Sequence, residues 1–111
     1  MITSFKMEDQ NIKMIRGDTV SFGLEFDGLD QDLDTAFFTC KYNHSDEILF
    51  KKSLSDGITK DDDNYYIVRI APNDTAGAEA GKYYYELQIG VNGDYFTILK
   101  GVFEIEADVT L

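Results

Sequence analysis

The stretch Glu79–Gly90, "EAGKYYYELQIG", sets the pattern that decides the fold. Its odd-numbered residues from 83 to 89 are aromatic or aliphatic, whereas its even-numbered residues from 82 to 88 are mainly polar. A period of two is typical of a strand that buries one face. The sequence therefore predicts a strand over 82–91. Asn92-Gly93-Asp94 then predicts a tight hairpin turn, because Asn and Gly tolerate positive φ, with a partner strand over 95–105.

The same period recurs along the rest of the chain. Val20, Phe22, Leu24 and Phe26 alternate with polar residues in a predicted strand over 19–26. Further strands are predicted over 4–7, 12–15, 35–42, 47–54 and 64–70. About seven short strands with polar turns between them are typical of an all-β antiparallel sandwich or barrel, here a single domain over 1–111.

Two local features depart from this alternation. Pro72-Asn73-Asp74-Thr75 predicts one helical or 3₁₀ turn near 72–78, with Asn73 or Asp74 accepting backbone N–H bonds. In the last strand, the apolar residues change parity between 98 and 99. Either both faces of that strand are covered, or a bulge near Lys100-Gly101 switches the parity, and the glycine favours the bulge.

The charge of the chain limits its partners. The 111 residues include 21 acidic and 10 basic residues, for a net charge of −11, and 43% are hydrophobic. Such a chain repels nucleic-acid phosphates and anionic membrane surfaces, so we expect no nucleic-acid partner. No apolar run approaches the ~18 residues of a membrane span, so no membrane insertion is expected. The N-terminal residues lack the apolar core of a secretory signal, which predicts synthesis in the cytoplasm.

The sequence offers little for catalysis. Cys40 and His44 form the one cysteine–histidine pair, and on an extended strand they lie about 13 Å apart, beyond hydrogen-bond reach. Cys40 is interpreted as a small buried apolar residue, and its being the one cysteine excludes an internal disulfide. One Cys and one His do not predict zinc, and a hydrolase built from scattered acids has no motif to support it. We expect no enzymatic activity.

Calcium has four candidate ligands, Asp30, Asp32, Asp61 and Asp63, in two carboxylate-dense stretches. The stretch that begins at Asp61 lacks the glycine at the sixth position of a calcium loop, and its twelfth residue is Pro72 rather than Glu. A solvated turn and a solvated loop are the competing interpretation. No cofactor is predicted.

Arg16-Gly17-Asp18 matches the tripeptide of integrin ligands. A turn or bulge that leads into the next strand explains its glycine equally well. The sequence is therefore interpreted here as a turn.

The tyrosines of the opening stretch resemble the corner of immunoglobulin-like domains. In those sandwiches a tyrosine near the start of the sixth strand bonds through its hydroxyl to backbone a few residues upstream. Tyr83 takes that place here, and Tyr85 takes the place of the second cysteine, with Leu24 at the opposing position. Tyr84 then faces outward. The resemblance implies an immunoglobulin-like β-sandwich of about seven strands, with a core held by packing alone.

A second resemblance covers about residues 12–110. The order of its short signatures is similar to that of the small immunoglobulin-like domains of bacteriophages and prophages of Gram-positive bacteria, akin to baseplate upper protein N-terminal and tail-fibre domains. The signatures are 15–19 (IRGDT), 38–41 (FTCK), 50–54 (FKKSL), 57–59 (GIT), 72–75 (PNDT), 81–86 (GKYYYE), 95–103 (YFTILKGVF) and 108–110 (DVT). The chain departs from the pattern at Cys40, where valine is usual, and at Glu86, where aspartate is frequent.

This resemblance implies a non-enzymatic structural or assembly protein of the virion, in a baseplate, tail or head. Its partners would be other phage structural proteins or further copies of itself, and it brings no catalytic or cofactor residues. The alternative is a carbohydrate-binding module that attaches to a host-surface glycan. In that case Tyr65, Tyr84 and Tyr95, the candidate surface contacts, would form the platform.

Overall fold

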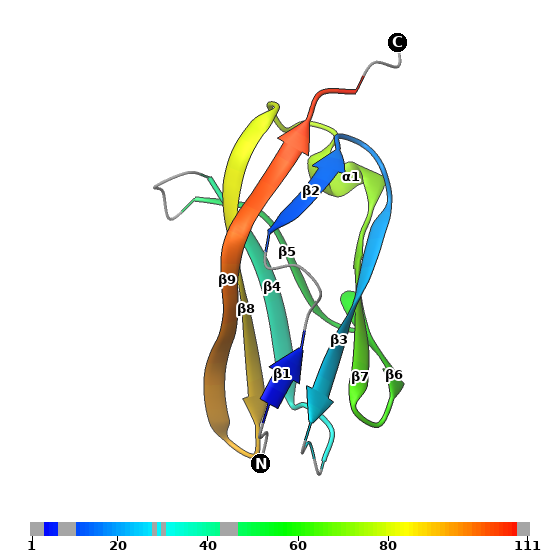
Figure 1. Cartoon of the computed structure of the whole chain (residues 1–111), viewed down its shortest axis with the longest axis vertical. Coiled ribbons are helices and arrows are strands. Elements are labelled where there is room, and N and C mark those ends of the chain that lie inside the picture. The colour runs from blue at the N-terminus through cyan, green and yellow to red at the C-terminus, as the bar shows by residue number, and fades with distance from the viewer. Residues whose placement is uncertain (1–3, 7–10, 28, 30, 43–46, 109–111) are drawn as a thin grey trace.

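Strands make up almost all of the regular structure in the computed structural model, which describes residues 4–6, 11–27, 29, 31–42 and 47–108. The elements in chain order are β1 (Ser4–Lys6), β2 (Ile12–Ile15), β3 (Val20–Asp27), β4 (Thr35–Lys41), β5 (Ile48–Leu54), β6 (Gly57–Asp62), β7 (Tyr65–Ile70), α1 (Pro72–Thr75), β8 (Gly81–Val91) and β9 (Asp94–Glu106). The predicted all-β class is therefore confirmed (Figure 1).

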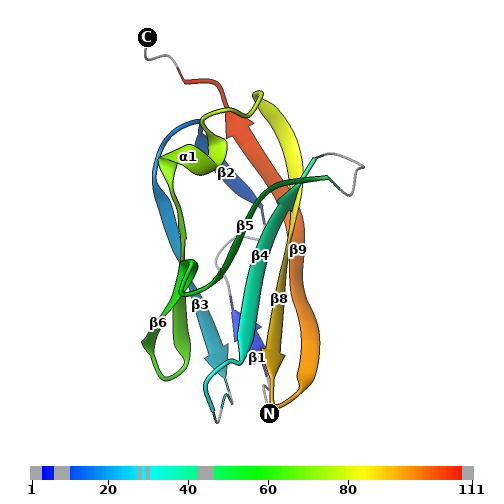
Figure 2. The same cartoon turned by 180° about the vertical axis from the view of Figure 1, so that it is seen from behind.

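The strands form one continuous sheet in the order β1-β3-β7-β6-β5-β4-β8-β9-β2. In its middle the sheet narrows, because β5 and β6 pair in parallel over two positions only, Ser53 with Gly57 and Leu54 with Ile58. Figures 1 and 2 show the sheet folded over itself, with β3, β7 and β6 facing β4, β8 and β9. We call β1, β3, β7 and β6 the β3 side, and β5, β4, β8, β9 and β2 the β8 side.

The core lies between the two sides and is centred on aromatic rings. The ring of Phe38 stacks on Tyr85, with centroids 5.0 Å apart and planes at 22°, and it meets Phe22 and Phe103 edge-on at 5.5 and 6.3 Å. Leu24, which the resemblance to antibody domains places at the position opposing Tyr85, is fully buried. Aromatic pairs at these separations stabilise a core beyond the area that they bury, by about 0.5–1.5 kcal/mol each.

Most predicted strands agree with the structure to within one or two residues. In β8 the residues at 83, 85, 87 and 89 are buried, and those at 82 and 84 are exposed, as the alternation predicts. The turn to β9 has positive φ at both Asn92 (52°) and Gly93 (84°), as expected. The predicted short helical turn is α1, where Asp74 Oδ2 accepts the Ala71 N–H at 2.7 Å. The predicted end of the first strand at Met7 lies outside the described residues.

The structure adds one strand to the predicted set and locates one predicted bulge. The sequence did not predict β6, because Gly57–Asp62 buries one apolar side chain, Ile58, and pairs through its backbone with β7. The parity change in β9 comes from a bulge, the alternative that the sequence favours, and the bulge lies two residues before Lys100. Leu87 pairs with Leu99 and Gln88 with Thr97, so the extra residue is Ile98. A bulge of this kind needs no glycine when the extra residue keeps a negative φ.

Candidate functional site

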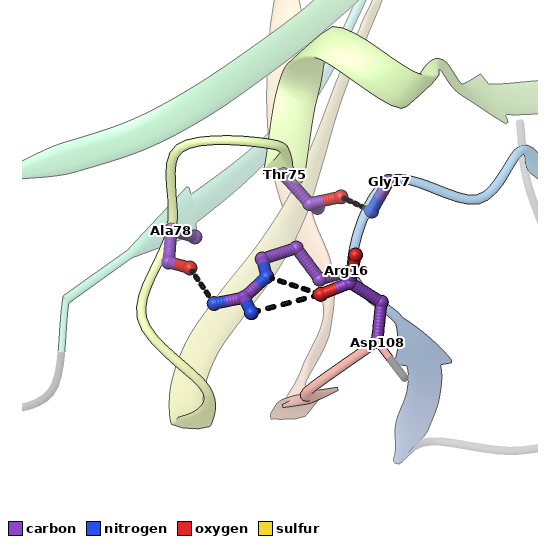
Figure 3. Close-up of polar contacts among 5 residues, drawn as sticks. All are labelled: Arg16, Gly17, Thr75, Ala78 and Asp108. Atoms are coloured by element: carbon purple, nitrogen blue, oxygen red, sulfur yellow. Dashed lines mark hydrogen bonds and ion pairs between the residues drawn. The ribbon is translucent and has the colours of Figure 1, made fainter. Parts of the chain in front are cut away.

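Arg16 connects three distant parts of the chain at the end of the molecule that carries α1. Its guanidinium donates to Asp108 Oδ1 from Nε at 3.1 Å and from Nη2 at 2.8 Å, and from Nη1 to the Ala78 carbonyl at 2.9 Å (Figure 3). These bonds hold the pKa of the Asp108 carboxyl below its ordinary value. The arginine of the Arg16-Gly17-Asp18 tripeptide is therefore engaged within the fold.

Gly17 joins the same cluster through its backbone. Its φ of +83° is in the left-handed region that favours glycine, and a bond from the Asp18 N–H to the Ile15 carbonyl, at 3.1 Å, closes the turn. The Gly17 N–H donates to the hydroxyl of Thr75, a fully buried residue of α1, at 2.9 Å. The predicted turn is present, and it is attached to α1.

A further ion pair attaches α1 to β5. Lys52 Nζ lies 2.6 Å from Asp74 Oδ2, and the two side chains are only 12% and 16% exposed. The same oxygen accepts the Ala71 N–H, so one carboxylate both caps the helix and binds the lysine. The lysine stem passes over Gly57, where a Cβ would lie 2.5 Å from its Cδ. Lys52 therefore packs across the narrow junction of the sheet.

Tyr83 has the geometry that the sequence predicts for a corner tyrosine. Its hydroxyl donates to the Glu79 carbonyl at 2.7 Å, and the residue is 6% exposed. Its ring also meets Tyr42, with centroids 5.5 Å apart. Burial is the main cause that raises the pKa of the Tyr83 phenol, followed by the neighbouring Tyr42.

Two further residues with ionisable groups lie in the core. Burial raises the pKa of the Cys40 thiol to about 12 and that of the Tyr85 phenol to about 12. A thiol with such a pKa holds very little thiolate at neutral pH, and the thiolate is the nucleophile. The prediction that Cys40 is a buried apolar residue is confirmed. His44 lies outside the described residues.

Two of the four calcium candidates come together, but around a lysine. Lys60 Nζ lies 2.6 Å from Asp32 Oδ1 and 3.5 Å from Asp63 Oδ1. The hydrogen bond to Asp32 is the largest cause that raises the pKa of Lys60. Asp61 is exposed beside them, and Asp30 lies outside the described residues. Within the described ranges, no group of three or more His, Cys, Asp or Glu side chains is placed to hold a metal ion.

Two of the three candidate surface tyrosines cover glycines. A Cβ on Gly23 would lie 1.8 Å from the Tyr65 hydroxyl oxygen, so the Tyr65 ring crosses the outer face of β3. A Cβ on Gly90 would lie 3.0 Å from the Tyr95 ring. Aromatic side chains placed over strand glycines protect backbone that has no side chain of its own. Tyr65 and Tyr95 thus have a structural role, although they are 37% and 65% exposed.

Tyr84, the third candidate, borders an open groove of about 370 Å³ on the outer face of the β8 side. The register places Lys41, Tyr84 and Val102 in one row across β4, β8 and β9. The next row holds Glu86 opposite Lys100. We call this the Tyr84 groove; it is lined by Asn11, Lys41, Tyr84, Tyr85, Glu86, Lys100, Gly101 and Val102.

The sequence did not single out the two lysines of this groove. Lys41 and Lys100 are 59 residues apart in the chain (100 minus 41), and only the pairing of β4 and β9 with β8 brings them to one surface. The outward parity of Tyr84 was the available signal. It identifies a face of one strand, but it does not identify the neighbours on the flanking strands.

Tyr65 lies on the β3 side, whereas Tyr84 and Tyr95 lie on the β8 side near opposite ends of the hairpin. The three candidate tyrosines therefore do not form one platform.

Comparison with known proteins gives a likeness of fold. No protein-family model matches the chain, and no curated protein matches its sequence. Among solved structures, CopC from Methylosinus trichosporium OB3b aligns with a TM-score of 0.53 at 10% identity, over 99% of this chain and 96% of that one. A chain from the structural study of T cell specificity and activation by the bacterial superantigen toxic shock syndrome toxin-1 aligns with a TM-score of 0.52 at 11% identity, over 95% of this chain and 98% of that one. At such identities the likeness supports the all-β fold alone. In the described part of the chain, no helix has the length and apolar character to cross a membrane.

Proposed function

We propose that this chain is a non-enzymatic structural or assembly module with an immunoglobulin-like β-sandwich fold. The order β1-β3-β7-β6 followed by β5-β4-β8-β9-β2 supports the fold. It places β3, β7 and β6 together on one side, as strands B, E and D are placed in immunoglobulin domains, and the hairpin β8–β9 beside β4 as F, G and C are placed. The bond from Tyr83 to Glu79 adds the corner of that fold.

One observation carries the functional proposal: the side chains best suited to chemistry, a guanidinium, a largely buried ammonium and a thiol, are engaged in holding the fold together. Arg16 is bonded to Asp108 and Ala78, and Lys52 is bonded to Asp74. The Cys40 thiol is buried with a raised pKa. A chain that uses its charged groups in this way is suited to presenting a rigid surface to partners.

The setting that we propose is a bacteriophage or prophage virion, after synthesis in the bacterial cytoplasm. The support is the ordered series of short signatures over residues 12–110. In this setting the partners are other virion proteins or further copies of the chain. The alternative, a glycan-binding module, has less support, because the three exposed tyrosines are separated on the surface.

The proposal is tested by prophage induction in the host that encodes the chain. Particles purified by density gradient are analysed by quantitative mass spectrometry, with the major capsid protein as the internal standard. We expect the chain at a fixed stoichiometry to the capsid protein across independent preparations. A chain that is expressed during induction but absent from intact particles contradicts the proposal.

A further inference from the structure

The Tyr84 groove brings positive charge to the surface of a strongly acidic chain. Lys41 and Lys100 border it, with Glu86 between them; Lys41 Nζ is 3.8 Å from Glu86 Oε1. Lys13, Lys51 and Lys82 lie on the same outer face by register, so five of the ten basic residues of the chain are found there. Three carboxylates share this face, at 86, 104 and 106. Five lysines against three carboxylates make this face slightly positive, and the excess of acid lies elsewhere.

Part of that excess protrudes at the turn between β6 and β7. Residues 61 to 64 are Asp-Asp-Asp-Asn, and all four are exposed. The turn has a defined shape, because Asp62 Oδ1 accepts the Asp63 N–H at 2.8 Å and Lys60 lies 3.5 Å from Asp63. In Figure 1 this turn forms the lower tip of the β6–β7 hairpin, at the opposite end from α1. We call it the acidic turn.

We propose that the Tyr84 groove of one copy binds the acidic turn of a second copy. The proposal rests on the assembly function proposed above and identifies the partner for this surface. Charge complementarity supports the choice: lysines flank the groove, and the carboxylates of Asp61 and Asp62 lie at an exposed tip. Ammonium–carboxylate hydrogen bonds are among the stronger polar contacts at an interface. The Tyr84 ring, 41% exposed, and Val102 supply an apolar floor.

The positions of the two surfaces determine the kind of assembly. The groove is on the outer face of the β8 side, and the acidic turn belongs to the β3 side, so one copy cannot join its own two surfaces. Two different surfaces in contact form a heterologous interface, which generates a closed ring or an open filament. Each copy then has one groove and one turn to offer. A two-fold arrangement uses both surfaces reciprocally and closes at a dimer, whereas any other rotation continues the assembly beyond a dimer.

The net charge gives this contact an unusual dependence on salt. At 0.01 M ionic strength the Debye length is about 30 Å, comparable to the 47 × 27 × 22 Å extents of the chain, so copies with a net charge of −11 repel one another. At 0.15 M it is about 8 Å, which screens the long-range repulsion but acts less on ion pairs in contact. We expect association to be strongest near 0.15 M and weaker at 0.01 M and at 1 M. An interface driven by apolar burial would instead strengthen steadily with salt.

The experiment is sedimentation velocity on three proteins at 0.15 M salt over a range of concentrations. The groove variant is Lys41→Gln with Lys100→Gln, which removes two charges and keeps similar side-chain length. The turn variant is Asp61→Lys with Asp62→Asn, which keeps an oxygen to accept the Asp63 N–H. Matched controls carry the same charge changes outside the groove and the turn: Lys13→Gln with Arg69→Gln, and Asp18→Lys with Asp94→Asn. Thermal unfolding establishes that every variant is folded.

We expect the wild-type chain to form dimers or larger species as concentration rises, and we expect both control variants to associate in the same way. The groove variant and the turn variant should each be monomeric. Their equimolar mixture should form 1:1 dimers and nothing larger, because the intact turn of the first binds the intact groove of the second and the remaining surfaces are inactive.

Two outcomes overturn the proposal. One is a wild-type chain that stays monomeric at millimolar concentration. This outcome also overturns the proposal if NMR spectra show that a glycan or an unrelated protein binds at Tyr84 and Lys100 instead. The other is a groove or turn variant that associates as well as its control. A monomeric chain that is nevertheless found in particles refutes this inference and leaves the assembly function in place. A self-associating chain that is absent from particles supports this inference and contradicts the proposed function in the virion.

Discussion

The two ends of the molecule use carboxylates in different ways. At the α1 end, which comprises the turn after β2, α1 and the end of β9, Asp74 and Asp108 bind cations from other elements at 2.6 and 2.8 Å. At the hairpin end, which holds the β6–β7 and β8–β9 turns, Asp32 and Asp63 lie around Lys60 with 69% and 91% of their side chains exposed. By contrast, the Lys52 and Asp74 side chains at the α1 end are only 12% and 16% exposed.

This difference shows that the net charge of −11 does not indicate what the individual carboxylates do. An ion pair exposed to water contributes about 0–1 kcal/mol. Removing one partner of a buried pair costs more, because it leaves a buried charge without a compensating charge. The carboxylates of the α1 end therefore hold elements together, and those of the hairpin end remain available to water and to partners. Substitutions at the two ends should have unequal effects on folding.

The largest effect is expected from Asp74→Ala. It removes the cap on the Ala71 N–H and leaves the Lys52 ammonium without its carboxylate. Loss of one partner of a well-buried pair costs about 3–5 kcal/mol, and the lower end of that range applies here because both side chains retain some exposure. Urea unfolding followed by circular dichroism measures the change, with Asp32→Ala as the control at about 0–1 kcal/mol. Equal losses for the two variants would contradict the difference between the ends.

Tyr83→Phe tests the corner. It removes the hydroxyl that donates to the Glu79 carbonyl at 2.7 Å while keeping the ring in place. Leaving a partly buried acceptor unpaired should lower the free energy of unfolding by about 1–3 kcal/mol. Tyr95→Phe, at a side chain that is 65% exposed, is the control and should change little. An unchanged unfolding midpoint for Tyr83→Phe would show that the hydrogen bond from Tyr83 to Glu79 does not stabilise the fold.

Thr75→Val tests the attachment of α1 to the turn after β2. The substitution keeps the volume of a fully buried side chain but leaves the Gly17 N–H without its acceptor. A loss of about 1 kcal/mol is expected, at the low end of the cost of an unpaired group, because Gly17 is only partly buried. Thr97→Val, on an exposed position of β9, is the matched control. Hydrogen exchange at Gly17 should accelerate in the Thr75 variant only.

The smallest effect concerns pH. Arg16 lowers the pKa of Asp108 in the folded chain from its ordinary value of 3.8. A lowered folded-state pKa stabilises the fold above the unfolded pKa, and this contribution is lost as pH falls through the folded value. NMR titration of the Asp108 carboxyl should show its pKa return toward 3.8 in Arg16→Met. A pKa that is the same in wild type and variant would mean that the arginine does not act on this carboxylate in solution.

The sequence predicts well those features that depend on neighbours in the chain. The buried parity of β8, the positive φ of Asn92 and Gly93, and the bond of Tyr83 to a carbonyl four residues earlier all follow from local patterns. The buried position of Cys40 follows from its type and its strand. Each of these depends on periodicity, on backbone conformation or on a motif of short range.

Features that depend on distant residues were not predicted. Arg16 and Asp108 are 92 residues apart, and Lys41 and Lys100 become neighbours only through β8. The strand β6 lacks apolar alternation, and its order comes from pairing with β7. A bulge was predicted near Lys100-Gly101, but its position at Ile98 is given only by the register of β9 with β8. Local sequence patterns carry no signal for contacts of this kind.

The parallel pairing of β2 with β9 also has a mechanical consequence. Ile12 to Ile15 lie beside Phe103 to Glu106 in the same direction. Figure 1 shows β1 near one end of the long axis and the chain leaving β9 at the other. A tensile load between those ends would pull β2 and β9 along their axes in opposite senses. Their hydrogen bonds would then be sheared together rather than unzipped one by one, so this short pairing would bear the load before the core is exposed.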